Sequence, residues 1–147
     1  MRTKVELRLV AAAALALLAA PLSTVADDTT EATFKVVLTG PEVSGDPDGR
    51  GEGTVTINPD TGEATVQLTY SNIAEPTQVH IRRGATGIEG NIVGTFHMKR
   101  EGRGRLSATG SVRYDHVQPL IESPENYYLV VQNNEHVVGA LRGPLRK

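Results

Sequence analysis

The sequence contains no cysteine and no tryptophan, and only two of its 147 residues are phenylalanine. Without cysteine, the chain forms no disulfide, and thiolate metal sites and cysteine nucleophiles are excluded as well. A lipid anchor attached to a cysteine at a processing site is excluded for the same reason. The core must therefore be built mainly from aliphatic side chains, and it has no covalent cross-links.

Short motifs of common enzyme classes are also missing. No G-x-S-x-G elbow surrounds a serine, no H-E-x-x-H motif occurs, and no glycine-rich phosphate loop lies between a strand and a helix. Each of the four histidines is separated from the next by 16 or more residues, so no two have the spacing of metal ligands on one strand or helix. We therefore expect a protein that is not an enzyme and has no cofactor and no resident metal.

One long uncharged run lies near the start of the chain. It spans Leu9–Ala20, follows a short basic segment, and precedes "TVA" at Thr24–Ala26. This order predicts a secretory signal peptide over residues 1–26, cleaved after Ala26. A membrane anchor is the alternative, but a spanning helix needs about 20 apolar residues. We expect a secreted or otherwise extracytoplasmic protein (extracellular, periplasmic or in the cell envelope) with no transmembrane segment in the mature chain.

The predicted mature chain, residues 27–147, has an uneven distribution of charge. Its twelve basic and sixteen acidic residues give a net charge of −4. Residues 27–78 hold ten acidic and two basic residues, or −8, whereas residues 79–147 hold six acidic and ten basic residues, or +4. Such asymmetry is typical of a fold with one acidic and one basic region. Nucleic acid is not an expected partner, because the net charge is negative and no aromatic stacking platform is present.

Alternating apolar and polar residues predict most of the secondary structure. The period of two in residues 33–39, 51–57, 63–70 and 105–114 predicts half-buried strands. The segment "NPDTGE" (residues 58–63) predicts a hairpin turn closed by Gly62. Residues 127–133, "YYLVVQN", are apolar on both faces and predict a central strand.

The remaining signals concern the end of the chain and the fold class. Pro144 predicts that the last strand lies at a sheet edge or ends there, and Pro119 limits the only helix candidate, residues 115–122, to at most one turn. A loose tail is expected at residues 27–32. Seven or eight short strands then predict one all-β domain over residues 33–147. The expected fold is an antiparallel β-sandwich or barrel of the immunoglobulin-like or superoxide dismutase-like Greek-key type.

Three segments resemble one known family in order and spacing. "FKVVLTGPEV", "QVHIRRGATGIEGNIV" and "YYLVVQNNEHVVGALRGPL" are similar to the CHRD domain, which occurs in chordin, an extracellular antagonist of growth factors, and in secreted microbial proteins. The resemblance spans residues 33–145 and implies a β-sandwich. It includes Gly139, Arg142 and Gly143, for which it implies structural roles, and we expect Arg142 to pair with a carboxylate across the sheet. Binding of growth factors is not transferred, because a shared fold does not imply a shared function.

The sequence departs from the family where many members carry histidines. The middle strand of many members has His-x-His, but here the positions are His80, Ile81 and Arg82, and Gln132 or Asn133 stands at the place of a third histidine. The family pattern implies an alternative function, a copper- or zinc-binding enzyme resembling superoxide dismutase. A copper site needs several converging imidazoles, and Arg82 places a positive charge at the second position. The other interpretation is a polar strand face with His80 and Arg82 side by side.

Two further segments are candidate sites. In "MKREGRGR", basic residues gather within a predicted hairpin, and short basic clusters attract polyanions. The candidate partner-binding residues are His80, Arg82, Arg83, Lys99, Arg100, Arg103 and Arg105. The alternative for the basic segment is a solvated hairpin. The segment "SGDPDGRGEG" is either a partial calcium loop or a solvated connection.

These observations predict a secreted, non-enzymatic binding or structural module. Its ligand is undefined by the sequence, and a protein or an acidic polymer outside the cell is the expected class of partner.

Overall fold

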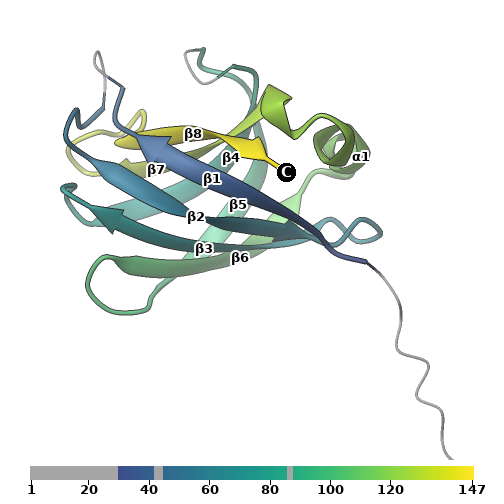
Figure 1. Cartoon of the computed structure of the whole chain (residues 1–147), viewed down its shortest axis with the longest axis horizontal. Coiled ribbons are helices and arrows are strands. Elements are labelled where there is room, and N and C mark those ends of the chain that lie inside the picture. Colours follow the sequence, from purple (N-terminus) through teal and green to yellow (C-terminus); the bar gives the residue numbers. More distant parts are fainter. Residues whose placement is uncertain (1–29, 42–44, 86–87) are drawn as a thin grey trace, which may run out of the picture.

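The computed structural model describes residues 30–41, 45–85 and 88–147. The predicted signal peptide and residues 27–29 of the predicted tail lie outside these described residues. Eight antiparallel strands form a closed barrel in the order β1-β2-β3-β6-β5-β4-β7-β8 (Figure 1). The strands are β1 (Ala32–Thr39), β2 (Arg50–Ile57), β3 (Glu63–Ser71), β4 (Pro76–Arg83), β5 (Ile92–Arg100), β6 (Arg105–Val112), β7 (Tyr127–Asn133) and β8 (Leu141–Arg146). A helix α1 (Tyr114–Glu122) and a short 3-10 helix (Pro124–Asn126) connect β6 to β7.

The predicted all-β antiparallel fold is confirmed, and its form is a barrel. Strands β4, β5 and β6 are neighbours in chain order, and β6 lies beside β3. The resulting spatial order, β3-β6-β5-β4, is a Greek-key arrangement. The barrel closes because β8 pairs with β1. The prediction of an edge position for the last strand is therefore wrong. The β1–β8 pairing joins Val36 to Leu145 and Thr39 to Arg142 but skips Pro144, so the missing amide hydrogen of proline breaks no pairing there.

The core fills the inside of the barrel with side chains from alternate positions of each strand. On β1, Phe34, Val36 and Leu38 are at most 2% exposed, as the alternation predicts. Strand β7 is buried along its whole length, which confirms that it is central. Of its residues, Tyr127, Leu129 and Val131 belong to the core cluster inside the barrel.

The β2–β3 hairpin confirms the predicted turn. The Gly62 amide donates to the Asn58 carbonyl at 2.9 Å, and Gly62 has a φ of 76°, a left-handed conformation that glycine adopts without strain. The Asn58 side-chain oxygen accepts hydrogen bonds from the amides of Asp60 and Thr61. Local turn chemistry therefore decides this connection.

Helix α1 is longer than the sequence predicts. It runs for nine residues through Pro119, and Val117 and Leu120, three positions apart, are buried in the core cluster. Packing of these two side chains compensates for the hydrogen bond that proline removes. Tyr114 is the last residue of the strand that the alternation predicts over residues 105–114. It is 82% exposed, because the chain leaves the sheet after Val112 and α1 begins at Tyr114.

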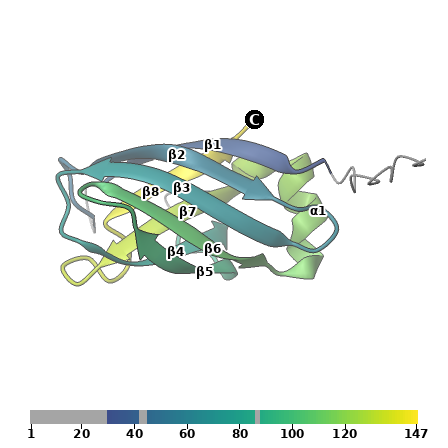
Figure 2. The same ribbon diagram turned by 90° about the horizontal axis from the view of Figure 1, so that it is seen from below.

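The two ends of the barrel differ. One end, here called the helix end, carries α1 and the β2–β3 turn (Figures 1 and 2). The opposite end, here called the loop end, carries the β1–β2, β5–β6 and β7–β8 connections (Figure 2). None of the helices in the described ranges is long and apolar enough to cross a membrane.

Candidate functional site

The outer surface of β4, β7 and β8 carries the histidine that the sequence singles out. Here His80 lies opposite Val130, which in turn lies opposite Arg142, so the three residues form a row across three strands. In the next row, Arg82 lies opposite Tyr128. We call these five residues the His80 face. Val79 and Ile81 are fully buried inside the barrel, which confirms the predicted division of this strand into two faces.

His80 is half-buried in this face. Its Nε2 atom lies 3.0 Å from the Oε1 atom of Gln78, whereas its buried Nδ1 atom has no hydrogen-bond partner. Burial lowers the pKa of His80, and the positive charge of Arg82 lowers it further. The imidazole is therefore neutral at pH 7. Its neighbours are an amide, a guanidinium and an aliphatic residue, which do not complete a metal site.

Arg82 and Tyr128 fasten the β4–β5 loop onto the His80 face. The Arg82 side chain is only 12% exposed, and its Nη1 atom donates to the Gly90 carbonyl at 2.8 Å and lies 3.8 Å from the Glu89 carboxylate. The Tyr128 hydroxyl donates to the Ile88 carbonyl at 2.6 Å and accepts from the Gly90 amide at 2.9 Å. These contacts give Arg82 a structural role and leave little of it for a partner.

Arg142 is held by backbone instead of by a carboxylate. It is 8% exposed, and its Nη2 atom donates to the Val138 carbonyl at 3.1 Å. No carboxylate partner for Arg142 is found in the described part of the chain, so the expected ion pair across the sheet is not seen there. Gly139 has a φ of 146°, and a Cβ atom there would lie 2.9 Å from Val130 and 3.0 Å from the Nε atom of Arg142. At Gly143, a Cβ atom would overlap the Val37 carbonyl.

The seven candidate partner-binding residues do not form one surface. Arg82 and Arg83 lie where β4 ends, opposite the start of β7 at Tyr127, near the helix end. The other four basic residues lie around the β5–β6 connection at the loop end. We call them the basic hairpin; they are Lys99, Arg100, Arg103 and Arg105. A partner that contacts the basic hairpin therefore approaches a different part of the barrel from one that contacts Arg83.

Two residues of the basic hairpin are paired with acids. Lys99 lies 3.5 Å from Glu101, and Arg100 lies 2.5 Å from Glu75. The Ser107 hydroxyl, which donates to Glu101 at 2.8 Å, lowers the pKa of this carboxyl, and Lys99 lowers it further. Exposed pairs of this kind contribute little stability, so they leave the hairpin free to exchange partners.

Next to the basic hairpin, the outer surface of β1, β2, β3 and β6 has a hollow of about 830 Å³. Its charged lining residues are two basic ones, Lys35 and Arg105, and two acidic ones, Glu52 and Glu101. Because these charges cancel, the hollow favours no class of charged ligand.

A polar cluster at the helix end secures α1. The His116 Nδ1 atom lies 3.1 Å from the Tyr127 hydroxyl, and its Nε2 atom lies 3.7 Å from Asp115. Burial raises the pKa of Tyr127, which is 2% exposed. A buried tyrosine that resists ionisation is unsuited to act as a nucleophile, so we assign these contacts to the attachment of α1 to β7.

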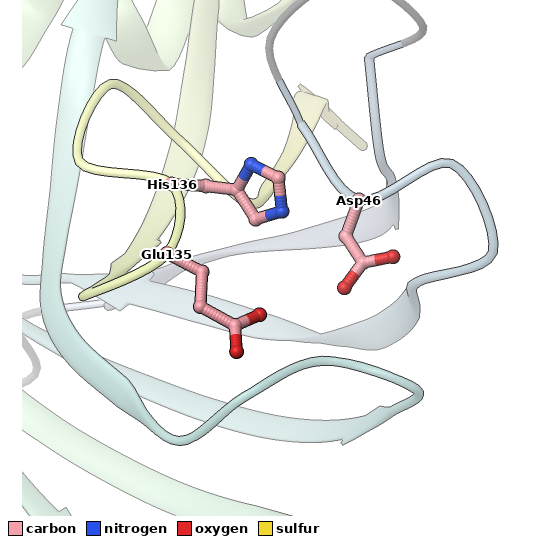
Figure 3. A group of neighbouring side chains, drawn as sticks. All are labelled: Asp46, Glu135 and His136. Atoms are coloured by element: carbon pink, nitrogen blue, oxygen red, sulfur yellow. The ribbon is translucent and has the colours of Figure 1, made fainter.

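Sequence reasoning missed one convergence of side chains at the loop end. Asp46, Glu135 and His136 are the one group of three potential metal ligands within the described ranges, and their donor atoms all lie within 4.8 Å of one another (Figure 3). Asp46 and His136 are 90 positions apart in the sequence. The pairing of β1 with β8 brings the loop after β1 beside the loop before β8, and no local pattern predicts that pairing.

Comparisons with known proteins agree with the resemblance in the sequence. A family model described as the CHRD domain matches residues 34–145, from the third residue of β1 nearly to the end of β8. Searches of curated proteins and of solved structures gave no match.

Proposed function

Since the match covers nearly the whole barrel, the protein belongs to the CHRD-domain family. We propose that it is exported from the cytoplasm and works outside it as a non-enzymatic module that binds an acidic polymer through its basic hairpin. The export rests on the signal-like segment at residues 1–26. The class of ligand is inferred from charge, because several cations that lie close together attract a polymer with repeated negative groups more strongly than a single cation does.

The observation that carries this proposal is the exposure of the hairpin turn. Arg103 lies between Gly102 and Gly104, whose φ angles of 111° and 70° turn the chain sharply. Arg103 and Arg105 are both exposed. Lys99 and Arg100 flank the turn and pair with acids only at the surface. An incoming anionic group can therefore displace Glu101 or Glu75 at small energetic cost.

The copper- or zinc-enzyme alternative rests on the family's histidine pattern, and the residues around His80 give it no support. His80 has Gln78 as its hydrogen-bond partner and Arg82 at the second position of the pattern. We therefore retain the non-enzymatic proposal.

Chromatography on heparin and on dextran sulfate tests the ligand class. The test variant replaces Lys99, Arg100, Arg103 and Arg105 with alanine. A matched control replaces four other exposed cations, which lie toward the helix end, Arg83, Arg113, Arg146 and Lys147. Both variants lose four positive charges, so they differ only in where the charge is lost.

We expect the wild type and the helix-end variant to be retained at low salt and the hairpin variant to elute early. Retention should fall as salt rises, because exposed charges are screened. Equal elution of the hairpin variant and the wild type would remove the proposal. Equal early elution of both variants would show that total charge, not the hairpin, causes retention.

A further inference from the structure

A backbone hydrogen bond joins the two loops that carry Asp46, Glu135 and His136. The Asp46 amide donates to the Ala140 carbonyl at 3.2 Å, which ties the β1–β2 loop to the β7–β8 loop. Figure 3 shows the His136 ring and the two carboxylates turned toward a shared space between these loops. Asp46 and His136 are partly buried, and Glu135 is exposed. The three donor groups therefore converge from two segments that the closed barrel holds together.

The buried side chain of Asn133 holds the backbone of the β7–β8 loop at Glu135 and His136. The Asn133 side-chain oxygen accepts hydrogen bonds from the amides of Glu135 at 3.1 Å and His136 at 2.8 Å. Asn133 is only 1% exposed, and its amide group donates to the Ala74 carbonyl at 3.1 Å. A buried residue thus sets the position of both potential ligands, which lowers the ordering cost of binding an ion.

The local charge favours a cation. Asp46 and Glu135 place two carboxylates within 4.8 Å of each other and of an imidazole. Like charges at such separations repel, and a divalent cation between them removes the repulsion.

We propose that Asp46, Glu135 and His136 together bind one divalent transition-metal ion of the zinc type. One imidazole with two carboxylates suits zinc, whereas calcium and magnesium take oxygen ligands almost exclusively. A point equidistant from three atoms 4.8 Å apart lies roughly 2.8 Å from each, and zinc bonds to nitrogen and oxygen measure about 2.0–2.2 Å. Rotation of the exposed Glu135 side chain and small shifts of the other two close this difference.

The ion would join the two loops and keep an open coordination position. Zinc is commonly four-coordinate, so three protein ligands leave one place for water or for a donor atom of a partner. The three proposed ligands are different residues from the basic hairpin, so metal binding here does not depend on polymer binding.

Isothermal titration calorimetry with zinc chloride, calcium chloride and magnesium chloride tests the site on protein purified without a histidine tag. We expect one zinc ion per chain and weaker binding of calcium and magnesium. His136→Ala, Asp46→Asn and Glu135→Gln should each lower zinc affinity at least about tenfold, since even indirect contacts to a metal are worth about 10–100-fold. The matched controls are His97→Ala and Glu125→Gln, both at exposed positions outside the group, and they should bind as the wild type does.

Thermal unfolding gives a second measurement. Zinc should raise the melting temperature of the wild type and of both controls, because the site exists only in the folded chain, and it should not raise that of the three ligand variants. Asp46→Asn and Glu135→Gln keep the shape of the side chain, so they decide the matter if His136→Ala does not fold. Absence of zinc binding at millimolar concentration, undiminished binding in the ligand variants, or equal loss in His97→Ala would each overturn the proposal.

Discussion

Arg82 and Tyr128 face each other across β4 and β7 and hold the two polar backbone groups of one residue, Gly90. Arg82 donates to the Gly90 carbonyl at 2.8 Å, and the Tyr128 hydroxyl accepts from the Gly90 amide at 2.9 Å. A pair of outward-facing side chains thereby fixes the end of the β4–β5 loop. Arg82, two positions after His80 on the same strand, therefore contacts a loop of its own chain.

Tyr128→Phe tests this attachment. The change leaves the Ile88 carbonyl and the Gly90 amide without their partner but preserves the buried ring. We expect a loss of about 1–3 kcal/mol in the free energy of unfolding, measured by urea denaturation, because both groups lose their bond to a buried hydroxyl. Tyr114→Phe is the control, since Tyr114 is 82% exposed and should change stability little. Equal effects at the two tyrosines would contradict the assignment.

The lowered pKa of His80 predicts a pH dependence of stability. The pKa lies below the ordinary value of 6.5, first because of burial and second because of Arg82. As the pH falls below 6.5, the unfolded chain takes up a proton before the folded chain does, so acid favours unfolding. Stability from this residue is therefore present above pH 6.5 and is lost toward the folded-state pKa.

His80→Gln should reduce the loss of unfolding free energy between pH 7 and pH 5, measured in parallel urea titrations. His97→Gln is the control, because His97 is an exposed histidine on the neighbouring strand β5, and it should keep the wild-type dependence. An unchanged pH profile in His80→Gln would show that burial of this imidazole carries no such linkage.

Gly139→Ala tests the packing around Arg142. A methyl group there meets Val130 and Arg142 at 3.0 Å or less, and the φ of 146° is itself strained for alanine. We expect a loss of about 1–3 kcal/mol from backbone strain, with a further loss from the overlap. Gly102→Ala isolates the first part, because Gly102 also has a positive φ but nothing lies within 4 Å of its Cβ position. Similar losses in both variants would mean that the overlap relaxes freely.

The proposed export predicts the first residue of the mature chain. Mass spectrometry of protein recovered outside the cytoplasm should show a chain that begins at Asp27, and Ala26→Leu should block this cleavage because signal peptidase requires a small residue there. Thr29→Leu, beyond the recognition positions, should leave it unchanged. Recovery of the chain with residues 1–26 intact would contradict the assignment of this segment.

Features that depend on neighbouring residues could be predicted from the sequence. The alternation that buries Val79 and Ile81 and turns His80 and Arg82 outward is confirmed, as are the β2–β3 turn and the central position of β7. Features that depend on distant contacts could not. The length of α1 comes from burial of Val117 and Leu120, which outweighs the local effect of Pro119.

The candidate sites show the same division. The basic hairpin could be predicted because its four cations lie within seven residues of sequence, but their separation from Arg82 and Arg83 follows from the antiparallel pairing of β4 with β5. The group of Asp46, Glu135 and His136 has no signature in the sequence, since its members lie on two loops that only the closed barrel brings together.

The sequence by itself determined the strand faces, the aliphatic core without disulfides and the family, because each of these is encoded by residue type and short-range spacing. Only the tertiary structure decided that the sheet closes into a barrel and that Arg82 and Arg142 donate hydrogen bonds to backbone carbonyls. It also decided that an aspartate and a histidine from opposite halves of the chain lie close together. The physical reason is that closure depends on the pairing of the first strand with the last, a long-range contact whose stability comes from the whole buried core.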